Sequence, residues 1–140
     1  MALCAKGYYD NTLFHRNIKG FIIQGGDGTG TGKGGQSIYG KNFKDEIVTE
    51  LKHDRRGILS MANNGPDSNN SQFFITYSKQ MHLNGFYTIF GKVIDEMETL
   101  DLLEKEPVGK GNKPINECKI KGVTIHANPI ADYEADNIYN

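Results

Sequence analysis

Apolar residues occur along the chain in short runs, and most of these runs are bounded by Gly, Asn or Asp. Short runs with such boundaries are typical of β-strands. A chain of several short strands and few helices favours an antiparallel β-barrel or sandwich. The strands that this pattern predicts cover residues 13–16, 21–24, 58–61, 72–76, 88–93 and 119–126.

Helical spacing is clearest over residues 97–103, where an apolar side chain recurs at every third position. Asp95 precedes this stretch and is placed to cap the helix, and Glu98 then takes the capping-box position. A second, shorter helix is expected over residues 2–6. The chain is therefore predicted to be mainly β, with one or two helices.

Two stretches are expected to be loops, and the end of the chain is expected to be a tail. Eight of the sixteen residues over 25–40 are glycine, and residues 65–71 are rich in Pro, Asp, Asn and Ser. Both compositions favour turns. Residues 130–140 contain three acidic side chains, and we expect them to form a loosely held acidic tail. Residues 1–129 then form a single domain.

Length, charge and cysteine content narrow the class of protein. A chain of 140 residues builds one domain with a sizeable core. The formal net charge is -1 and the basic residues are scattered, which argues against direct nucleic-acid binding, because phosphate recognition needs clustered positive charge. Cys4 and Cys118 are too few and too distant for a disulfide framework or a zinc site. Without a membrane-length apolar run or a signal-peptide pattern, we expect a nuclear or cytoplasmic protein with no membrane partner.

The candidate chemistry begins with an arginine and a glutamine eight residues apart, Arg16 and Gln24. The turn at 19–20 would join two strands and bring these side chains to one surface, with Phe21 and Ile22 between them. Such a surface offers a cation, an amide and apolar groups, but no nucleophile and no set of metal ligands. It suits a reaction that needs a hydrogen-bond donor beside an apolar pocket. Rotation about a prolyl peptide bond is such a reaction.

A second group of candidates lies downstream, over residues 60–66, 70–76, 82–83 and at Tyr87. Strand alternation places Gln72 and Phe74 on the same face of the predicted strand 72–76. Spacing alone does not separate a binding role for these aromatic residues from ordinary core packing.

Other motifs are weaker. Residues 30–35 match the spacing of a dinucleotide-binding fingerprint, but no helix is predicted after them, so a tightly turning surface loop is the better interpretation. The histidines lack ligand spacing and are expected to be structural or exposed rather than metal ligands. They are His15, His53, His82 and His126.

Several segments together resemble the cyclophilins, a family of prolyl cis–trans isomerases. The resemblance runs from about residue 2 to about residue 126, and implies a closed antiparallel barrel of eight strands with two helices. Within the family the chain is most similar to the group called peptidyl-prolyl isomerase-like 3, which is associated with the spliceosome. The segments that carry the family resemblance are 14–16, 24–27, 57–63, 71–75 and 90–93.

The resemblance implies a role for each matching residue. Arg16 corresponds to the catalytic arginine, and Gln24 to the glutamine that holds this arginine and the substrate carbonyl. Gly32 corresponds to a glycine on the far side of the substrate groove. The remaining substrate-binding positions are Phe21, Ile22, Phe74, Leu83 and Tyr87 in the proline pocket, Ala62, Asn63 and Gln72 in the groove, and His82.

The chain departs from the family pattern in four ways. Ile22 replaces a methionine found in many members, and Tyr87 replaces a histidine. His82 stands where the best cyclosporin binders have tryptophan, so we expect weak cyclosporin binding at best. The two opening strands of the family are also missing from this sequence. An incomplete barrel leaves apolar surface uncovered, including parts of Leu59 and Met61, Ile89 or Ile125, and we expect self-association through it.

The resemblance implies an isomerase that acts on proline-containing peptides or proteins and requires no cofactor and no metal. Assistance of protein folding or remodelling, in the spliceosome, is the expected setting. The alternative is a non-catalytic module that uses the same pocket to bind a proline loop within an assembly. The presence of Arg16, Gln24 and Phe74 favours the enzyme.

Overall fold

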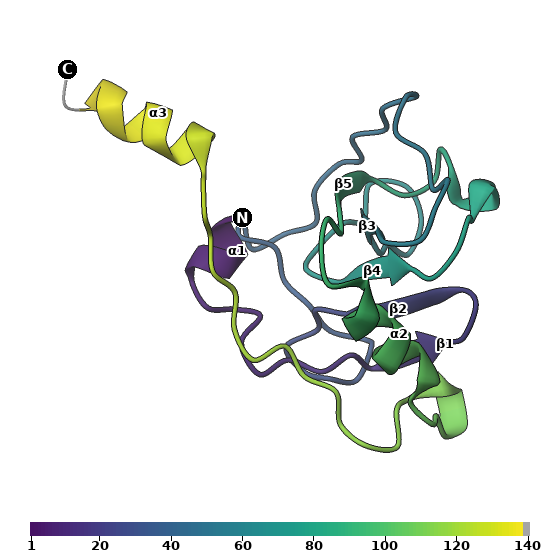
Figure 1. Cartoon of the computed structure of the whole chain (residues 1–140). Coiled ribbons are helices and arrows are strands. Elements are labelled where there is room, and N and C mark those ends of the chain that lie inside the picture. The colour runs from purple at the N-terminus through teal and green to yellow at the C-terminus, as the bar shows by residue number, and fades with distance from the viewer. Residues whose placement is uncertain (139–140) are drawn as a thin grey trace.

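The computed structural model describes residues 1–138 of the chain and contains one five-stranded antiparallel sheet (Figure 1). Its strands lie in the order β1-β2-β4-β3-β5. The strands are β1 Arg16–Ile18, β2 Ile22–Gly25, β3 Ile58–Met61, β4 Phe73–Thr76 and β5 Ile89–Lys92. The helices are α1 Ala2–Ala5, α2 Met97–Lys105 and α3 Pro129–Ile138, with the short 3-10 helices η1 Met81–Leu83 and η2 Lys110–Asn112.

Four of the six predicted strands are present, with ends shifted by at most one residue. The predicted strand 13–16 is displaced: it shares only Arg16 with β1, which extends to Ile18. The predicted strand 119–126 is wrong: Lys119 forms one isolated bridge with Leu13. Hydrogen bonds between residues 11–14 and 118–120 hold this part of the chain extended, but they do not continue as a ladder.

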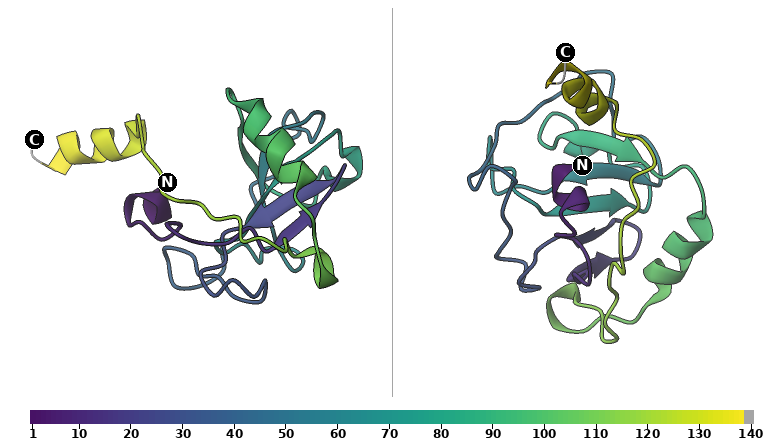
Figure 2. Two further views of the ribbon diagram at one scale, coloured as in Figure 1. Left: turned by 60° about the horizontal axis from the view of Figure 1, so that its bottom comes forward. Right: turned by 90° about the vertical axis from the view of Figure 1, so that its left-hand side faces the viewer.

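The sheet has two apolar faces because side chains alternate along its strands. Ile22 and Phe74 pack on one face, beside Leu83. Ile23 and Ile75, their neighbours along the chain, pack on the opposite face, beneath α2. Figure 2 shows α2 lying over the sheet, whereas α3 extends away from it. Consecutive residues of the central strands therefore build two separate cores, of which only one is covered by a helix.

The side chain of Arg56 fastens α2 to the sheet. Its guanidinium contacts Asp101 Oδ1 at 2.6 Å and Glu104 Oε1 at 2.8 Å, and it lies 5.2 Å from the centre of the Tyr77 ring. The buried Asn17 of β1 adds a further connection, since its Nδ2 donates to the carbonyl of Leu103 at 2.7 Å. These polar contacts fix the helix over an apolar face that would otherwise tolerate sliding.

The predicted capping of α2 is wrong, although the helix itself is confirmed. Glu96 is the N-cap residue and has a left-handed backbone with φ 57° and no side-chain cap. Asp95 Oδ1 accepts instead from the backbone N–H of Glu96 at 2.8 Å. Because this local hydrogen bond occupies the carboxylate, the N-cap lies one residue after the predicted one, and Glu98 has no capping-box partner.

The acidic segment 130–140, predicted to be a loosely held tail, is helical over most of its length as α3, and residues 139–140 lie outside the described part of the chain. The sequence contains a start signal for this helix that composition alone does not show. Asn128 Oδ1 accepts from the N–H of Ala131 at 3.4 Å, Pro129 occupies the first turn, and Asp132 carries negative charge there. The short helix predicted over residues 2–6 is present as α1.

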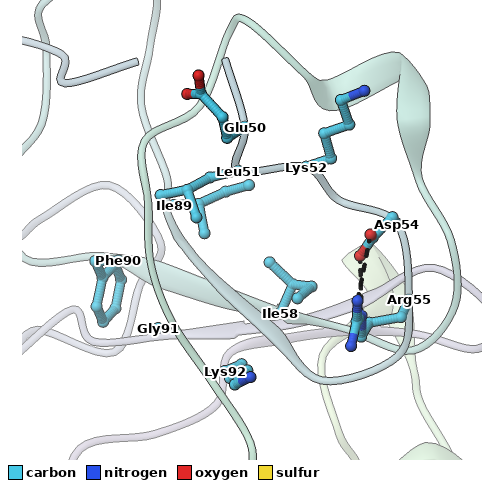
Figure 3. Close-up of a pocket in the computed structure, with 10 residues that line it drawn as sticks. All are labelled: Glu50, Leu51, Lys52, Asp54, Arg55, Ile58, Ile89, Phe90, Gly91 and Lys92. Atoms are coloured by element: carbon cyan, nitrogen blue, oxygen red, sulfur yellow. Dashed lines mark hydrogen bonds and ion pairs between the residues drawn. The ribbon is translucent and has the colours of Figure 1, made fainter. Parts of the chain in front are cut away.

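Within the described residues the sheet does not close on itself through hydrogen bonds, so β1 and β5 are its edges. Beside β5 lies a pocket of about 410 Å³, lined by residues 50–52, 54–55, 58 and 89–92 (Figure 3). Phe90 and Ile94 near it are 53% and 88% exposed, whereas Leu59 and Ile89 are half-buried. The edge strand thus carries one of the exposed apolar side chains of the protein, Phe90. No described helix is long and apolar enough to span a membrane.

We predict that Tyr77→Phe lowers the free energy of unfolding by about 1–3 kcal/mol, the usual cost of a buried polar group left without its partner. The hydroxyl of Tyr77 donates to Oδ1 of the buried Asn17 at 2.6 Å, beneath α2. Urea unfolding of the two proteins measures the difference. Lys79→Ala, at an exposed position nearby, is the control and should stay close to the parent. Equal stability of Tyr77→Phe and the parent would contradict the prediction.

Candidate functional site

Arg16 lies at the start of β1, and the β1–β2 hairpin determines its partner. The register places it opposite Gln24, and Arg16 Nη1 donates to Gln24 Oε1 at 3.3 Å. The turn is closed by the N–H of Phe21, which donates to the carbonyl of Ile18 at 2.9 Å. The spacing of eight residues in the sequence therefore becomes a direct contact, as predicted.

Gln24 in turn contacts Gln72, which precedes β4. Gln24 Nε2 donates to Gln72 Oε1 at 3.0 Å. The Nε2 of the buried Gln72 donates to two loop carbonyls, Gly32 at 3.0 Å and Gly34 at 2.7 Å. Four of the predicted positions are thus joined by one line of hydrogen bonds that ends at the arginine.

The apolar part of the site is the sheet face that α2 does not cover. Ile22, Phe74 and Leu83 form its buried cluster, with Phe21 and Tyr87 packed against it. The Tyr87 ring meets that of Phe74 edge-on, with centroids 5.5 Å apart and an interplanar angle of 84°. Ala62 completes this cluster. All the residues predicted for the proline pocket therefore lie together.

The two parts of the site meet through the sheet. Gln24 lies opposite Phe74 in the β2–β4 register, so the arginine and its amide partner border the apolar cluster. At the other end, the exposed His82 is stacked on Phe21, with ring centroids 5.9 Å apart and an interplanar angle of 28°. The structure thus places a cation at one border of the apolar cluster and an imidazole at another.

Asn63, predicted for the substrate groove, uses its side chain within the protein. Its Nδ2 donates to the carbonyl of Phe86 at 2.8 Å, and its Oδ1 accepts from the N–H of Gly65 at 3.2 Å. The neighbouring Ala62 donates its N–H to the carbonyl of Gln72 at 3.0 Å. Asn63 therefore fixes the loop that begins after β3, beside the apolar cluster.

Sequence reasoning missed the contribution of His53 to the site. Its side chain is 0% exposed, and its ring stacks on that of Phe74 with centroids 5.9 Å apart. Asn84 Oδ1 accepts from the backbone N–H of His53 at 2.8 Å and contacts Nδ1 at 2.9 Å. Because this oxygen is an acceptor, Nδ1 carries a proton, and Nε2 lies 3.1 Å from Ser60 Oγ. Nothing in the spacing of the four histidines indicates this position.

Two buried histidines are held in environments that disfavour their charged form. Burial lowers the pKa of His53, although its hydrogen bond with Asn84 opposes the shift. Burial likewise lowers the pKa of His15, and the opposing attraction of Asp27 is smaller. Both rings are therefore neutral at the pH where an ordinary histidine begins to accept a proton.

Comparison with known proteins shows the class to which this fold and site belong. The crystal structure of a cyclophilin type peptidyl-prolyl cis-trans isomerase from Cryptosporidium parvum, determined in the presence of the dipeptide Ala-Pro, superposes with a TM-score of 0.87. It is 65% identical in sequence, and the match covers 91% of this chain and 82% of that one. The fold is that of a cyclophilin.

The sequence comparisons agree. Residues 1–125 match the family described as Cyclophilin type peptidyl-prolyl cis-trans isomerase/CLD, and the chain belongs to this family. Peptidyl-prolyl cis-trans isomerase CYP18-1 of Arabidopsis thaliana is 66% identical over 131 residues. Peptidyl-prolyl cis-trans isomerase-like 3 of Homo sapiens is 63% identical over 132 residues. Each match covers 94% of this chain and 82% of the relative.

We predict that the folded protein loses stability when the pH is lowered from about 7.5 to about 5.5, because the unfolded chain then binds more protons than the folded one. His53 and His15 have pKa values below the ordinary 6.5 in the folded state. Their contribution to the free energy of unfolding is fully present above pH 6.5, and it is lost as the pH falls through the lowered pKa values. Urea unfolding across this range measures the slope.

The variant His53→Gln should show a smaller slope than the parent, because it removes one of the two buried imidazoles. The free energy of unfolding of the variant is compared with that of the parent at each pH. A loss of packing lowers this free energy equally at every pH, so it leaves the slope unchanged. Stability that rises on acidification, or a slope that His53→Gln leaves unchanged, would contradict the assignment.

Proposed function

We propose that this chain catalyses cis–trans isomerisation of peptide bonds that precede proline. The observation that carries the proposal is the placement of the Arg16 guanidinium, held by Gln24 at 3.3 Å, beside the apolar cluster around Phe74. Membership of the cyclophilin family supports it. The substrates are proline-containing peptides or proteins, and the chemistry calls for no covalent intermediate.

The barrier to rotation arises from resonance between the amide nitrogen and the carbonyl, and is about 18–20 kcal/mol. A catalyst therefore needs to stabilise the twisted bond. In that state the prolyl nitrogen has a localised lone pair and accepts a hydrogen bond. The guanidinium of Arg16 remains charged at working pH and presents fixed donors. The apolar cluster formed by Ile22, Phe74 and Leu83 receives the proline ring.

The division of labour in the site follows from this mechanism. The ring is bound in the ground state and in the twisted state alike, whereas the hydrogen bond from Arg16 to nitrogen forms only after rotation begins. Interactions that strengthen only in the transition state raise kcat. A hydrogen bond from a charged donor contributes about 1.5–3 kcal/mol, which corresponds to a rate factor of roughly ten to one hundred.

A non-catalytic module is the competing proposal, since the same apolar cluster would bind a proline loop without turnover. Hydrogen bonds that fix Arg16 and Gln24 favour catalysis, because ground-state binding of a proline ring does not require an oriented cation. A coupled peptide assay separates the two. Acceleration of isomerisation means an enzyme, whereas peptide affinity without acceleration means a module.

We further propose a nuclear or cytoplasmic protein that assists folding or remodelling in the spliceosome. The support is similarity to the isomerase-like 3 group, including relatives 63% identical to this chain. Co-purification of the tagged chain with assembled splicing particles, retained in Arg16→Ala, tests this setting. We also propose weak cyclosporin binding, because His82 stands where the best cyclosporin binders have tryptophan, and an imidazole lacks the large face and the donor geometry of an indole.

We predict that Arg16→Ala lowers kcat by roughly ten- to a hundredfold while peptide affinity changes by only about twofold. The hydrogen bond to nitrogen is made in the twisted state, so its loss affects turnover rather than ground-state binding. Arg16→Lys should also be impaired, since an ammonium cannot present the same planar fork. Line-shape NMR measures the exchange rate and calorimetry the affinity. An equal loss in both quantities would exclude this role for Arg16.

We predict that the protein self-associates through the edge strand β5 and the residues that follow it, because Phe90 of β5 is 53% exposed and Ile94, two residues beyond the strand, is 88% exposed. A sheet edge with exposed apolar side chains offers free backbone groups and apolar area to a second copy. Phe90→Lys and Ile94→Lys should each shift the protein toward monomer in light scattering. Leu102→Lys, on α2 and 68% exposed, is the matched control and should not. A monomeric parent, or an equal effect of the control, would contradict the prediction.

A further inference from the structure

The glycine-rich loop that follows β2 is closed around the carboxylate of Asp27, which is 0% exposed. Its Oδ1 accepts from the N–H of Thr29 at 2.8 Å, and its Oδ2 accepts from the N–H groups of Gly32 at 2.8 Å and Gly34 at 3.0 Å. The hydroxyl of Thr29 donates to the same carboxylate. A buried charge is costly unless it is fully hydrogen-bonded, and here backbone and side-chain donors from the loop meet that requirement.

The same two glycines face Asp27 with their N–H groups and Gln72 with their carbonyls. Gly32 O and Gly34 O accept from Gln72 Nε2 at 3.0 and 2.7 Å. The carboxylate therefore sets the loop conformation that aims these carbonyls at the glutamine. Burial raises the pKa of Asp27, but the hydrogen bonds from Thr29, Gly34 and Gly32 lower it by more, so its pKa lies below the ordinary value.

The loop carbonyls also determine which way both amides point. With its NH2 group facing two carbonyls, Gln72 must turn Oε1 toward Gln24, whose Nε2 donates to it at 3.0 Å. Gln24 must then turn its own Oε1 toward Arg16, whose Nη1 donates to it at 3.3 Å. Arginine carries only donors. If Gln72 were reversed, Gln24 would reverse too, and an NH2 group would face the guanidinium.

We propose that Asp27 is a positioning residue for the isomerase reaction. It orders the glycine-rich loop, whose carbonyls fix the orientation of the hydrogen-bonded amides of Gln72 and Gln24, which we call the relay. In this orientation the relay presents an acceptor oxygen to Arg16. The predicted effect on kcat rests on the proposed function. The orientation of the relay, in contrast, is a property of the free protein. The hydrogen bonds of Asp27 are made with the loop residues Thr29, Gly32 and Gly34, and it acts on the amides through this loop.

Two variants disturb the carboxylate in different ways. Asp27→Asn keeps the size of the side chain but places an NH2 group against backbone N–H donors. Gly34→Ala leaves the charge intact, but its Cβ would lie 2.6 Å from Asp27 Oδ1, which forces the two apart. Tyr77→Phe, on the opposite face of the sheet, is a control for lost stability without a change in the relay.

We expect Asp27→Asn and Gly34→Ala to lower kcat by about tenfold with KM within about twofold, since one oriented hydrogen bond is lost. Tyr77→Phe should retain kcat. In the Arg16→Ala background, Asp27→Asn should add little further loss, because both act on the same step. Heteronuclear NMR of the free proteins should show shifted side-chain signals of Gln24 and Arg16 in both loop variants and unshifted ones in Tyr77→Phe.

The NMR measurement distinguishes a failure of this proposal from a failure of the proposed function. If the parent chain has no isomerase activity but the loop variants shift the Gln24 and Arg16 signals, the function fails and the relay stands. If either loop variant folds with unshifted signals, or if kcat falls equally in Tyr77→Phe at matched stability, the positioning role of Asp27 is overturned. Should Asp27→Asn fail to fold, Gly34→Ala carries the same test.

Discussion

β2 pairs with β4 so that Gln24 lies opposite Phe74 and Ile23 opposite Ile75. A slip of one residue would exchange the two faces of either strand. Ile22 would then point toward α2, and the arginine's amide partner would border the helix instead of the apolar cluster. Every other feature of the site depends on this register, because Arg16 is placed only by pairing with β2 and Gln72 only by preceding β4.

The register is secured from the face away from the site. Ile23 and Leu100 are buried there, and Arg56 binds α2 through Asp101 and Glu104. The helix secures one face of the sheet, and the other face carries the buried cluster of Ile22, Phe74 and Leu83. This cluster is bordered by the amide partner of Arg16 and by the exposed His82, which stacks on Phe21.

Prediction from the sequence succeeded where the interaction is local or periodic. Arg16 and Gln24 belong to one hairpin, so a turn and a spacing suffice to bring them together. The proline pocket was assigned by resemblance, and strand alternation alone did not distinguish Phe74 from an ordinary core residue. The missing strand over 119–126 shows the limit of apolar pattern: an extended segment needs a neighbour along its whole length to become a strand, and Lys119 has only its bridge to Leu13.

Polar burial was the feature that sequence could not predict. His53 and Asp27 are both 0% exposed, although their residue types usually lie at the surface. Asn84, the partner of His53, lies 31 positions away and is brought close only by the tertiary fold. The backbone donors to Asp27 are only 2, 5 and 7 positions away, but they are N–H groups of the main chain. Backbone carbonyl and N–H groups do not depend on residue type, so no sequence motif indicates which of them will bind a buried side chain.

This buried polarity also explains how a site without covalent chemistry can be specific in its geometry. An arginine on a long flexible side chain loses conformational entropy when it is ordered for reaction. An acceptor fixed beforehand lowers that cost, provided that it cannot rotate to present a donor instead. Gln24 alone could do so, because its amide is nearly symmetric in shape. Gln72 and the two loop carbonyls remove this freedom, so the orientation of a surface cation is ultimately set by backbone groups around a buried carboxylate.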